Sequence, residues 1–326
     1  MTDLKQKILA AAASELIEIE KALSENLKPY VDLVSDVAGH IIFSGGKRLR
    51  PLLMILSARL CDYTGNYDVT FSTAIEYLHA ATLLHDDIVD GAKLRRGKPV
   101  AHTQWEDAIV VLVGDFLLAR SLTISAATGK IEIIKVLSKL TEDMSQGEVH
   151  QLMRKGDISL TEEEYLEVIR RKTAVLFEAA CRTSAILSDA NDLNKNALAE
   201  YGHNLGVAFQ ITDDLFDYTL DTAQFGKEVG ADLKEGKMTL PVIYALSQAN
   251  SADREKMIKI IKDDSFSVED FTALVGMLKK YGGTDYAEKM AATFIQAAKD
   301  ALSIFASSES KEIMLDIADY VLLRRV

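Results

Sequence analysis

The sequence predicts an all-α fold, and three observations support this prediction. Apolar residues recur at helical spacing in nearly every segment of the 326-residue chain, and no strand-like alternation extends beyond a few residues. Only 4 prolines and 18 glycines interrupt the chain, which permits long helices. No Ser/Pro-rich linker or shift of composition divides the sequence, so we expect a single domain over residues 1–326.

The individual helices follow from apolar spacing and from proline positions. From Asp3 to Leu23 apolar residues recur on one face, which predicts one amphipathic helix ending before Pro29. Pro51 and Pro241 suit the first turn of a helix, where the missing N–H is not needed. The other predicted helices cover residues 30–43, 50–61, 67–89, 105–127, 130–154, 161–188, 191–219, 239–248, 252–263, 267–280, 283–305 and 309–324.

The bulk properties exclude several functional classes. A net charge of −12 argues against a nucleic-acid partner, which would require a basic face. The two cysteines, Cys61 and Cys181, lack metal-ligand spacing and indicate reduced thiols in the cytoplasm. The N-terminus lacks the apolar core of a secretory signal, and the most apolar run, 109–114, is too short to span a bilayer. We therefore expect a cytoplasmic protein without a transmembrane segment.

Two aspartate clusters of nearly identical spelling, HDDIVD at 85–90 and TDDLFD at 212–217, stand in apolar helical patterns. In a helix the DDxxD spacing lets all three carboxylates reach toward one side. Such a group needs compensating cations, and Mg²⁺ favours a few carboxylates together with water and phosphate oxygens. A solvated helix edge is the alternative for one cluster, but two clusters with apolar flanks favour a Mg²⁺–diphosphate site. The expected metal ligands are Asp86, Asp87, Asp90, Asp213, Asp214 and Asp217.

Basic residues gather at three breaks between predicted helices, at 44–48, 91–98 and 221–237. Arg95 and Arg96 follow the first aspartate cluster and suit a diphosphate clamp. A second cationic group lies away from the aspartates in sequence and predicts a metal-free anion pocket; it consists of Lys47, Arg48 and Arg50. Further candidates near the aspartates are Lys172, Lys227 and Lys237.

These segments resemble the trans-isoprenyl diphosphate synthases, and most closely the long-chain octaprenyl and heptaprenyl type. The resemblance rests on GGKRLRP at 45–51, residues 76–99, VGDF at 113–116, GEV at 147–149, KTA at 172–174, FQITDD at 209–214 with Asp217, GK at 226–227 and DLKEGK at 232–237. The matches cover most of residues 40–245 in the family's order, whereas the chain beyond about residue 250 matches in helical character alone.

The resemblance implies an isoprenoid-synthase helical bundle around a central cavity, and a head-to-tail condensation of isopentenyl diphosphate with an allylic diphosphate. About three Mg²⁺ ions on the aspartates would hold the allylic diphosphate, assisted by Arg95, Lys172, Thr173, Gln210, Lys227 and Lys237. Isopentenyl diphosphate would occupy the pocket of Lys47, Arg50, His79 and Arg96. The catalytic set would be Asp86, Asp87, Asp90, Arg95, Lys172, Asp213, Asp214 and Lys227, and a homodimer is implied.

The residues preceding Asp86 bear on product length. In short-chain family members, bulky aromatics four and five residues before this aspartate close the tail pocket, whereas this chain has Ala81 and Thr82, with Leu78 one turn below. We expect an open wall and an all-trans product of about 30–50 carbons, since each helical turn adds about 5.4 Å of depth. Leu122 and Leu137 are candidates for the tunnel floor, and Tyr77 could shorten the tunnel by turning into it.

Other functions fit parts of the sequence. A shorter-chain farnesyl or geranylgeranyl diphosphate synthase shares the same motifs. The two ExxH motifs, at 76–79 and 200–203, have the spacing of a di-iron carboxylate bundle, which would hold iron tightly. Terpene cyclases generally replace the second aspartate cluster with an Asn/Ser/Glu motif, and non-catalytic synthase subunits lose their aspartates, whereas this chain has both clusters.

Overall fold

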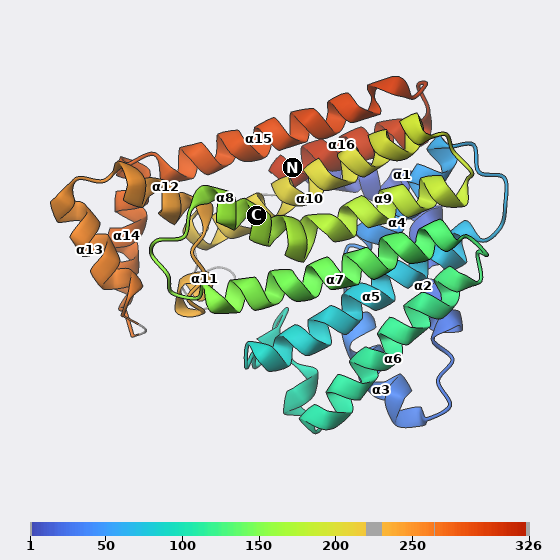
Figure 1. Cartoon of the computed structure of the whole chain (residues 1–326), viewed down its shortest axis with the longest axis horizontal. Helices are drawn as coiled ribbons and strands as arrows, with labels where there is room; N and C mark the ends of the chain where they lie inside the picture. The colour runs from blue at the N-terminus through green and yellow to red at the C-terminus, as the bar shows by residue number, and fades with distance from the viewer. Residues whose placement is uncertain (1, 220–229, 264, 324–326) are drawn as a thin grey trace.

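The computed structural model of the chain describes residues 2–219, 230–263 and 265–323, and it is built almost wholly of helices (Figure 1). Two adjacent two-residue strands form its only described sheet, an antiparallel hairpin. In chain order the elements are α1 (Thr2–Ala11), α2 (Ala13–Leu27), α3 (Asp32–Ile42), α4 (Leu49–Leu60), α5 (Asp68–Val89), β1 (Leu94–Arg95), β2 (Lys98–Pro99), η1 (Ala101–Thr103), α6 (Asp107–Ala126), α7 (Ile131–Met153), α8 (Glu162–Ile169), η2 (Arg170–Ala174), α9 (Val175–Leu187), α10 (Asp192–Thr219), α11 (Ala231–Lys234), α12 (Leu240–Gln248), α13 (Ser251–Ile261), α14 (Val268–Lys280), α15 (Gly283–Ala301), η4 (Leu302–Ile304) and α16 (Glu309–Leu323).

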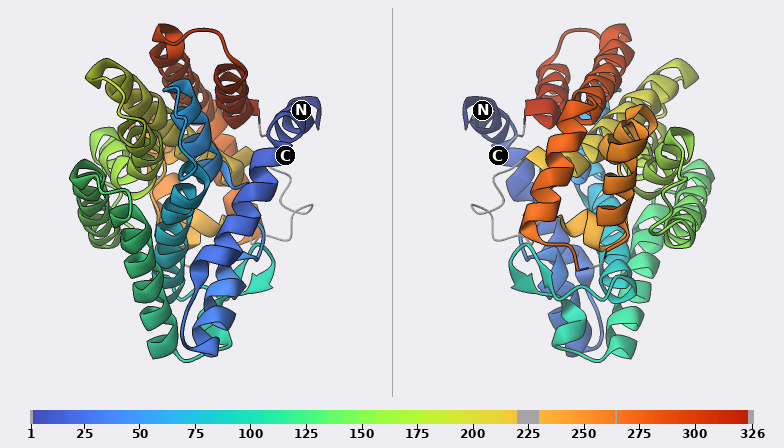
Figure 2. Two further views of the ribbon diagram at one scale, coloured as in Figure 1. Left: turned by 90° about the vertical axis from the view of Figure 1, so that its right-hand side faces the viewer. Right: turned by 90° about the vertical axis from the view of Figure 1, so that its left-hand side faces the viewer.

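The long helices α5 and α10 carry the two aspartate clusters and organise the bundle. α5 packs against α2, α4 and α6, and α10 packs against α9, α15 and α16. Figures 1 and 2 show these helices running along a common direction, with α13 and α14 set apart at one end. One apolar core joins α1–α7, α9 and α10 with α15 and α16, and a second core lies under α8, α11 and the α12–α14 helices. The all-α prediction is confirmed.

The prediction of a single helix from Asp3 to Leu23 is wrong, because this segment forms two helices, α1 and α2. Ala12 leaves the helical conformation with φ −105° and ψ 18°, and α2 then continues to Leu27. Ala12 is fully buried, so the bend brings both helices onto the core. The apolar spacing alone did not reveal this break, since the same face is buried on both sides of it.

The helix predicted over 161–188 is also interrupted. A π-helical turn, η2, separates α8 from α9 and adds one residue to the helical turn. Gly147 of α7 and Gly206 of α10 allow the neighbouring helices to approach this turn closely. A Cβ at Gly147 would lie 2.7 Å from the Arg171 Cβ, and one at Gly206 would lie 2.6 Å from the Ala174 Cα. The turn carries Lys172 and Thr173, both predicted at the site.

The break predicted at 91–98 is the β1–β2 hairpin, in which Leu94 pairs with Pro99. Arg96 and Gly97 form its turn, both with positive φ, which glycine adopts freely at Gly97. His40 of α3 bonds the Pro99 carbonyl oxygen at 2.8 Å and so ties α3 to the hairpin. The predicted break at 221–237 contains α11, and its residues 221–229 lie outside the described residues.

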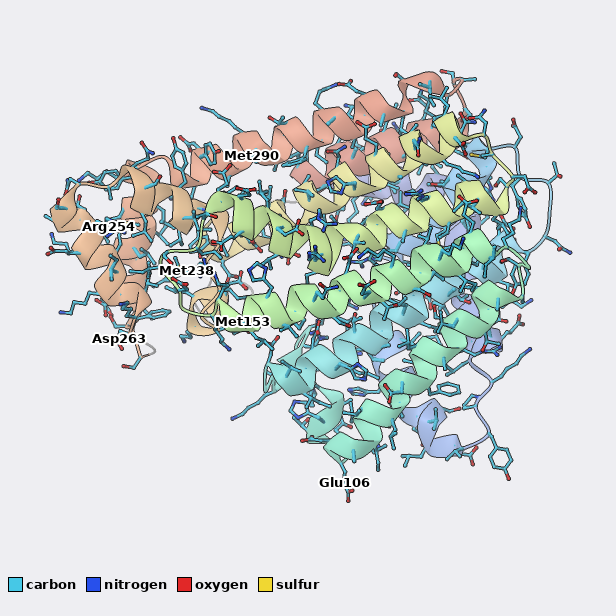
Figure 3. The ribbon with its side chains drawn as sticks, viewed as in Figure 1. Glu106, Met153, Met238, Arg254, Asp263 and Met290 are labelled. Atoms are coloured by element: carbon cyan, nitrogen blue, oxygen red, sulfur yellow. The ribbon has the colours of Figure 1, made fainter. Side chains whose placement is uncertain are left out.

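Helix α6 differs from the other described helices in its exposed apolar surface. It begins after Glu106 (Figure 3), and its apolar residues are spread around the whole helix. Within the described residues it is the one helix long and apolar enough to cross a membrane, with mean hydropathy 1.8 over 18 residues and 39% of that window buried. Its Asp107, Asp115 and Arg120 are charged, and Leu112 is 66% exposed. A helix that packs on the core of a protein and also contacts a second protein chain has the same composition. The composition of α6 is therefore only weak evidence that it crosses a membrane.

Candidate active site

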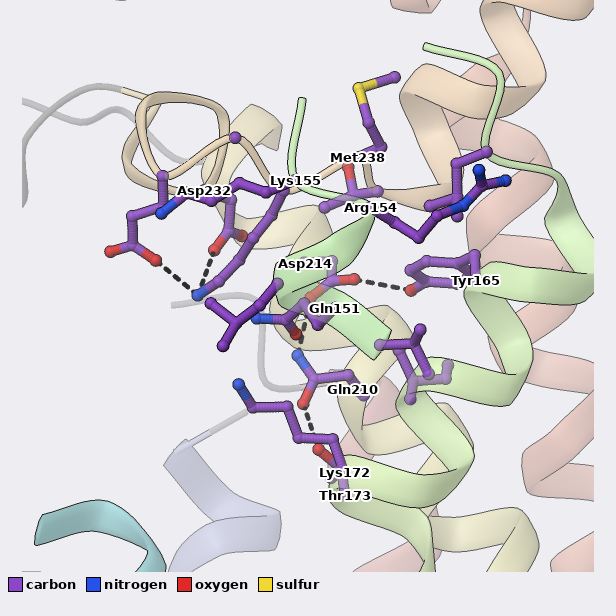
Figure 4. A pocket seen from close by; sticks show the side chains of 18 of the residues that line it. Gln151, Arg154, Lys155, Tyr165, Lys172, Thr173, Gln210, Asp214, Asp232 and Met238 are labelled. Atoms are coloured by element: carbon purple, nitrogen blue, oxygen red, sulfur yellow. Dashed lines mark hydrogen bonds and ion pairs between the residues drawn. The ribbon is translucent and has the colours of Figure 1, made fainter. Parts of the chain in front are cut away.

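One cavity brings together residues that lie far apart in the sequence. It opens between the C-terminal ends of α5 and α7, the η2 turn, α10 and the segment around α11 (Figure 4). Six of the residues predicted from sequence line it, namely Asp90, Lys172, Thr173, Gln210, Asp214 and Lys237. The two aspartate clusters therefore share one end of the bundle with four of the predicted polar and cationic groups beside them.

Asp214 is held by donors on both of its oxygens. Gln210, one helical turn earlier on α10, donates from its amide Nε2 to Oδ1 at 2.7 Å, and the Tyr165 hydroxyl donates to Oδ2 at 2.6 Å. The Thr173 hydroxyl donates to the Gln210 Oε1 at 2.8 Å, which completes a chain of three hydrogen bonds (Figure 4). Burial raises the pKa of Asp214 to about 7, although the two hydrogen bonds oppose this shift.

Lys172 reaches from the π-helical turn toward both aspartate clusters. Its ammonium lies 2.6 Å from Oε2 of Glu148 on α7, and its charge acts on Asp86 of α5. Burial raises the pKa of Asp86 to about 6 against the opposing charge of Lys172. Oε1 of Glu148 is buried and has no hydrogen-bond partner within the described part of the chain. This end of the bundle thus concentrates negative charge that one lysine does not neutralise.

The first cluster divides into different environments. Asp87 is 2% exposed and accepts two hydrogen bonds from Arg95 at Oδ1, from Nε at 2.9 Å and from Nη2 at 2.7 Å. Asp86 and Asp90 are partly exposed, and Asp90 lines the cavity. Arg95, whose side chain is 33% exposed, therefore pairs with the buried member of the cluster, and its charge also acts on Asp86.

The second cluster is divided in a similar way. Asp213 is exposed, Asp214 is buried, and Asp217 accepts a hydrogen bond at 2.8 Å from the backbone N–H of Asp232. Lys237 lies 3.8 Å from Asp232 and 2.5 Å from Glu235, and these neighbours raise its pKa. Lys227, which was predicted here, lies outside the described residues.

The second cationic group assembles around His79. A Cβ on Gly46 would lie 3.3 Å from Nη1 of Arg48 and 3.4 Å from Nη1 of Arg96, so the 45–50 loop and the hairpin meet here. Burial holds the pKa of His79 well below its ordinary value, and the nearby arginines, led by Arg50, lower it further. A neutral imidazole among guanidinium groups suits a pocket that attracts an anion.

Aromatic rings support the remaining members of this cationic group. The Arg50 guanidinium lies 4.5 Å from the centre of the Phe177 ring, and the Lys47 ammonium lies 5.2 Å from that of Tyr320. Arg48 has a different role from the one the sequence suggested. It is 6% exposed, and it donates to Glu76 at 2.8 Å, to the Ile42 carbonyl at 2.7 Å and to Glu20. These acceptors engage Arg48 within the protein, so the anion pocket is left to its neighbours.

The donor set fits Mg²⁺ that a diphosphate helps to coordinate. Across the described ranges, no three acidic, histidine or cysteine side chains are close enough to form a complete metal site by themselves. Mg²⁺ is usually held by one or two carboxylates, waters and substrate phosphates, so a complete protein cage is not required. Suitable oxygen donors are the partly exposed Asp86 and Asp90, the exposed Asp213 and the unpaired Oε1 of Glu148.

Comparison with known proteins decides the family. Residues 31–278 match the family model described as polyprenyl synthetase. The chain belongs to this family. It is 35% identical over 319 residues to octaprenyl diphosphate synthase of Escherichia coli strain K12, which covers 98% of each chain. It is also 35% identical over 291 residues to a short chain isoprenyl diphosphate synthase of Methanothermobacter thermautotrophicus, covering 87% of this chain and 88% of the other.

The fold agrees with this assignment to the polyprenyl synthetases. The crystal structure of a polyprenyl synthase from Caulobacter crescentus, complexed with calcium and isoprenyl diphosphate, superposes with a TM-score of 0.92 at 35% identity, covering 99% of this chain and 98% of the other. The resemblance inferred from the motifs is confirmed, and the chain is a trans-prenyltransferase. The di-iron alternative is set aside, because Glu76 of the first ExxH motif is bonded to Arg48 and the family is a different one.

The sequence did not predict three residues that lie beside the site. They are Glu148, Tyr165 and Asp232, which contact Lys172, Asp214 and Lys237 respectively. Glu148 and Asp232 belong to matched motifs, so their positions were visible although no role was assigned to them. Tyr165 gave no such signal, because an aromatic residue at helical spacing is typical of an ordinary core position.

Proposed function

We propose that this enzyme condenses isopentenyl diphosphate with an allylic diphosphate in the presence of Mg²⁺. Its product is a long all-trans polyprenyl diphosphate with a chain of about 30–50 carbons, which needs a tunnel deeper than one helical turn. The observation that carries the proposal is the cavity in which Asp90 and Asp214, from opposite aspartate clusters, meet Lys172 and Lys237. An independent cationic group around His79 supplies the second diphosphate pocket that a two-substrate condensation needs.

The allylic diphosphate binds at the aspartate end of this cavity. Asp86, Asp90, Asp213 and Asp217 would hold about three Mg²⁺ ions with it, while Asp87 and Asp214 would keep their hydrogen bonds to Arg95 and Tyr165. When bound, the metal ions neutralise negative charge on the leaving diphosphate. Lys172 leaves Glu148 for the diphosphate, and Thr173, Gln210, Lys227 and Lys237 orient it.

Isopentenyl diphosphate binds through Lys47, Arg50, His79 and Arg96. The charges there hold its diphosphate so that the carbon–carbon double bond faces the allylic carbon. The bond from that carbon to the diphosphate oxygen breaks, the double bond attacks the allylic cation, and the released diphosphate accepts the proton that is then lost. The protein contributes orientation and a preorganised electrostatic field, without a covalent intermediate.

The product length is supported by the small side chains at 81 and 82. Tyr77 does not turn toward a tunnel in this structure, because its hydroxyl donates to the Leu23 carbonyl at 2.6 Å and the side chain is fully buried against α2. Leu78 and Ala81 are buried, while Thr82 is partly exposed and donates to the His79 carbonyl. Relatives named for short and for octaprenyl chains share 35% identity with this sequence, so overall similarity does not select a length.

We also propose a cytoplasmic homodimer that covers the exposed apolar side of α6, where Val111 and Leu112 lie on the surface. Burying Leu112 against a second copy would explain the high hydropathy of this helix. Sedimentation velocity checks this, since Leu112→Glu should convert a dimer into monomers. A wild-type protein that sediments as a monomer would exclude the dimer.

The decisive experiment for the function is product sizing. The enzyme is incubated with farnesyl diphosphate, labelled isopentenyl diphosphate and Mg²⁺, and the dephosphorylated products are separated by chain length. The proposal requires labelled products longer than geranylgeranyl that depend on Mg²⁺. Products that stop at geranylgeranyl length would support the short-chain alternative, as would elongation of shorter allylic starters but not of farnesyl diphosphate. The absence of elongation with every allylic starter would overturn the function.

A further inference from the structure

We propose that Tyr165 is a positioning residue for the allylic diphosphate site, acting through the hydrogen-bond chain Tyr165–Asp214–Gln210–Thr173. This inference rests on the proposed function and names a residue that does not itself reach the substrate. Tyr165 is 3% exposed, lies on α8 and is one of the residues that line the cavity from its apolar side. Its hydroxyl donates to Asp214 at 2.6 Å, a short distance typical of a hydroxyl bonded to a carboxylate.

The chain fixes the orientation of each member in turn. With Oδ2 of Asp214 occupied by Tyr165, Oδ1 accepts from the Gln210 amide nitrogen. The Gln210 oxygen is then turned toward Thr173, whose hydroxyl donates to it at 2.8 Å. The orientation of the Gln210 amide is fixed, because its oxygen accepts from Thr173 and its nitrogen donates to Asp214. Its second N–H and the neighbouring Lys172 are thereby held at the cavity wall.

The contacts link α10 to α8 and to the π-helical turn η2, which continues directly from α8. Thr173 lies in the π-helical turn η2, and Gln210 and Asp214 lie one turn apart on α10. A π-helical turn is intrinsically less favourable than α-helix and needs support from its surroundings. The hydrogen bonds from Thr173 through to Tyr165 provide such support from α10 and α8. The position of Lys172 therefore depends on contacts that begin at Tyr165.

Removing the Tyr165 hydroxyl has a specific consequence. Phenylalanine fills the same space, so the apolar packing is kept, but Oδ2 of Asp214 loses its buried donor. The carboxylate can then turn toward another donor, and the acceptor for Gln210 is no longer fixed. Partners that orient the groups at a metal site typically change metal affinity or activity by about 10- to 100-fold when they are lost.

The chain offers a matched control. Tyr218 is also 3% exposed and belongs to the same apolar core, and its hydroxyl lies 2.8 Å from the Thr239 hydroxyl rather than from a carboxylate. Tyr218→Phe removes one buried tyrosine hydroxyl and its bond, as Tyr165→Phe does. It leaves the contacts of Asp214 and Gln210 in place, so it reports the general cost of losing such a bond.

The first test measures binding without turnover. Calorimetric titration of inorganic pyrophosphate with Mg²⁺ into the full-length wild type, Tyr165→Phe and Tyr218→Phe compares affinities directly. We expect Tyr165→Phe to weaken the Mg²⁺-dependent binding by roughly tenfold or more, with Tyr218→Phe close to wild type. Melting temperatures measured in parallel should fall by similar amounts in the two variants. Equal pyrophosphate affinities for Tyr165→Phe and wild type would overturn the inference.

The second test uses steady-state kinetics with both substrates. Tyr165→Phe should raise the KM for the allylic diphosphate or lower kcat, and leave the KM for isopentenyl diphosphate unchanged. Equal weakening toward both substrates would indicate a merely structural role. If Tyr165→Phe does not fold, Asp214→Asn breaks one link of the same chain, because the amide keeps a single acceptor oxygen for the two donors, Tyr165 and Gln210, and the same split is expected. A wild type that binds pyrophosphate but elongates no allylic diphosphate would refute the function and leave the binding comparison to decide the role of Tyr165.

Discussion

The ammonium of Lys172 lies 2.6 Å from Oε2 of Glu148, beside a cavity that Asp90 and Asp214 also line. A carboxylate on α7 thus neutralises the one lysine that the π-helical turn delivers to this end of the bundle. The charge of Lys172 also acts on Asp86 of the first aspartate cluster. Lys172 lines the same cavity as Asp214 of the second cluster. A diphosphate that arrives with Mg²⁺ competes with Glu148 for this lysine.

This arrangement predicts that the two diphosphate pockets can be separated by mutation. Lys172→Ala should raise the KM for the allylic diphosphate by about tenfold or more, the effect of losing a charged hydrogen bond of about 1.5–3 kcal/mol. Lys47→Ala and Arg50→Ala should instead raise the KM for isopentenyl diphosphate. Steady-state kinetics with each substrate varied in turn measures the difference. Equal effects of all three changes on both substrates would mean one shared pocket.

Arg95→Ala belongs to the same experiment as an allylic-side variant, but its result needs a stability measurement beside it. Arg95 is the hydrogen-bonding partner of the buried Asp87, so its removal leaves a carboxylate in the interior without that partner. We expect lower thermal stability as well as weaker allylic binding. Lys172→Ala needs the same measurement, because its partner Glu148 is 17% exposed and its Oε1 already has no hydrogen-bond partner among the described residues.

A second prediction concerns the partly exposed aspartates. Asp86→Ala and Asp213→Ala should each lower kcat by roughly 100-fold or more, the scale of losing one electrostatic contact to the reacting groups. Their melting temperatures should stay near wild type, because burial already disfavours the charge on Asp86, whose pKa is raised to about 6, and Asp213 is exposed. The exposed Asp36 on α3 is a suitable control for both. Near-normal turnover in both variants would refute the Mg²⁺ assignment.

Arg48 provides a prediction about stability alone. Its guanidinium is buried beside Glu76 and the Ile42 carbonyl and also bonds the half-exposed Glu20, and its backbone has φ +48°. Arg48→Ala should reduce the free energy of unfolding by about 3–5 kcal/mol, as expected when one member of a buried ion pair is removed. Lys21→Ala, which breaks an exposed pair with Glu25, should change it by less than about 1 kcal/mol. Denaturant titration of both variants compares them, and similar small changes would show that the Arg48 network is not stabilising.

The sequence predicted the helical architecture and many residues of the candidate site, but it did not predict which charged side chains pair with one another. Helical spacing, proline positions and the two DDxxD clusters are local patterns, and they were sufficient to predict the all-α fold and six of the residues that line the cavity. The bend at Ala12 and the π-helical turn at 170–174 were missed because they keep the same residues buried. The pairing of Asp87 with Arg95 and of Arg48 with Glu76 depends on which charged groups the bundle encloses together, and sequence spacing carries no information on that.

The two cysteines give a prediction about pH. Burial raises the pKa of Cys61 to about 11 and that of Cys181 to about 12, compared with about 8.5 for an unfolded thiol. At pH 8 iodoacetamide should therefore modify the folded protein slowly and the urea-unfolded protein rapidly, as followed by mass spectrometry. Because the unfolded thiols ionise first, the folded state should lose relative stability as pH rises above about 8.5. Rapid modification of Cys181 in the folded protein would contradict this environment.

The last prediction tests the product length through Ala81. This side chain is 3% exposed on α5, roughly one helical turn (about 5.4 Å) before the first aspartate cluster. A phenylalanine there would place a ring across the expected path of the growing chain. If that path is open, Ala81→Phe should stay folded and active. Its products should shorten toward about 15–20 carbons, because the tunnel would be a few helical turns shallower.

The stability of the same variant shows whether the space is open or filled. Overpacking a filled core costs about 1–3 kcal/mol, so a marked fall in melting temperature would indicate that Ala81 packs against a neighbouring helix. Tyr77→Phe is the control, because Tyr77 lies on the same helix and its hydroxyl is bonded to Leu23 on α2. It should leave the product distribution unchanged while removing one buried hydrogen bond. If wild type already stops at farnesyl or geranylgeranyl length, or if Ala81→Phe leaves the products as long as before, small residues at 81 and 82 do not determine chain length in this enzyme.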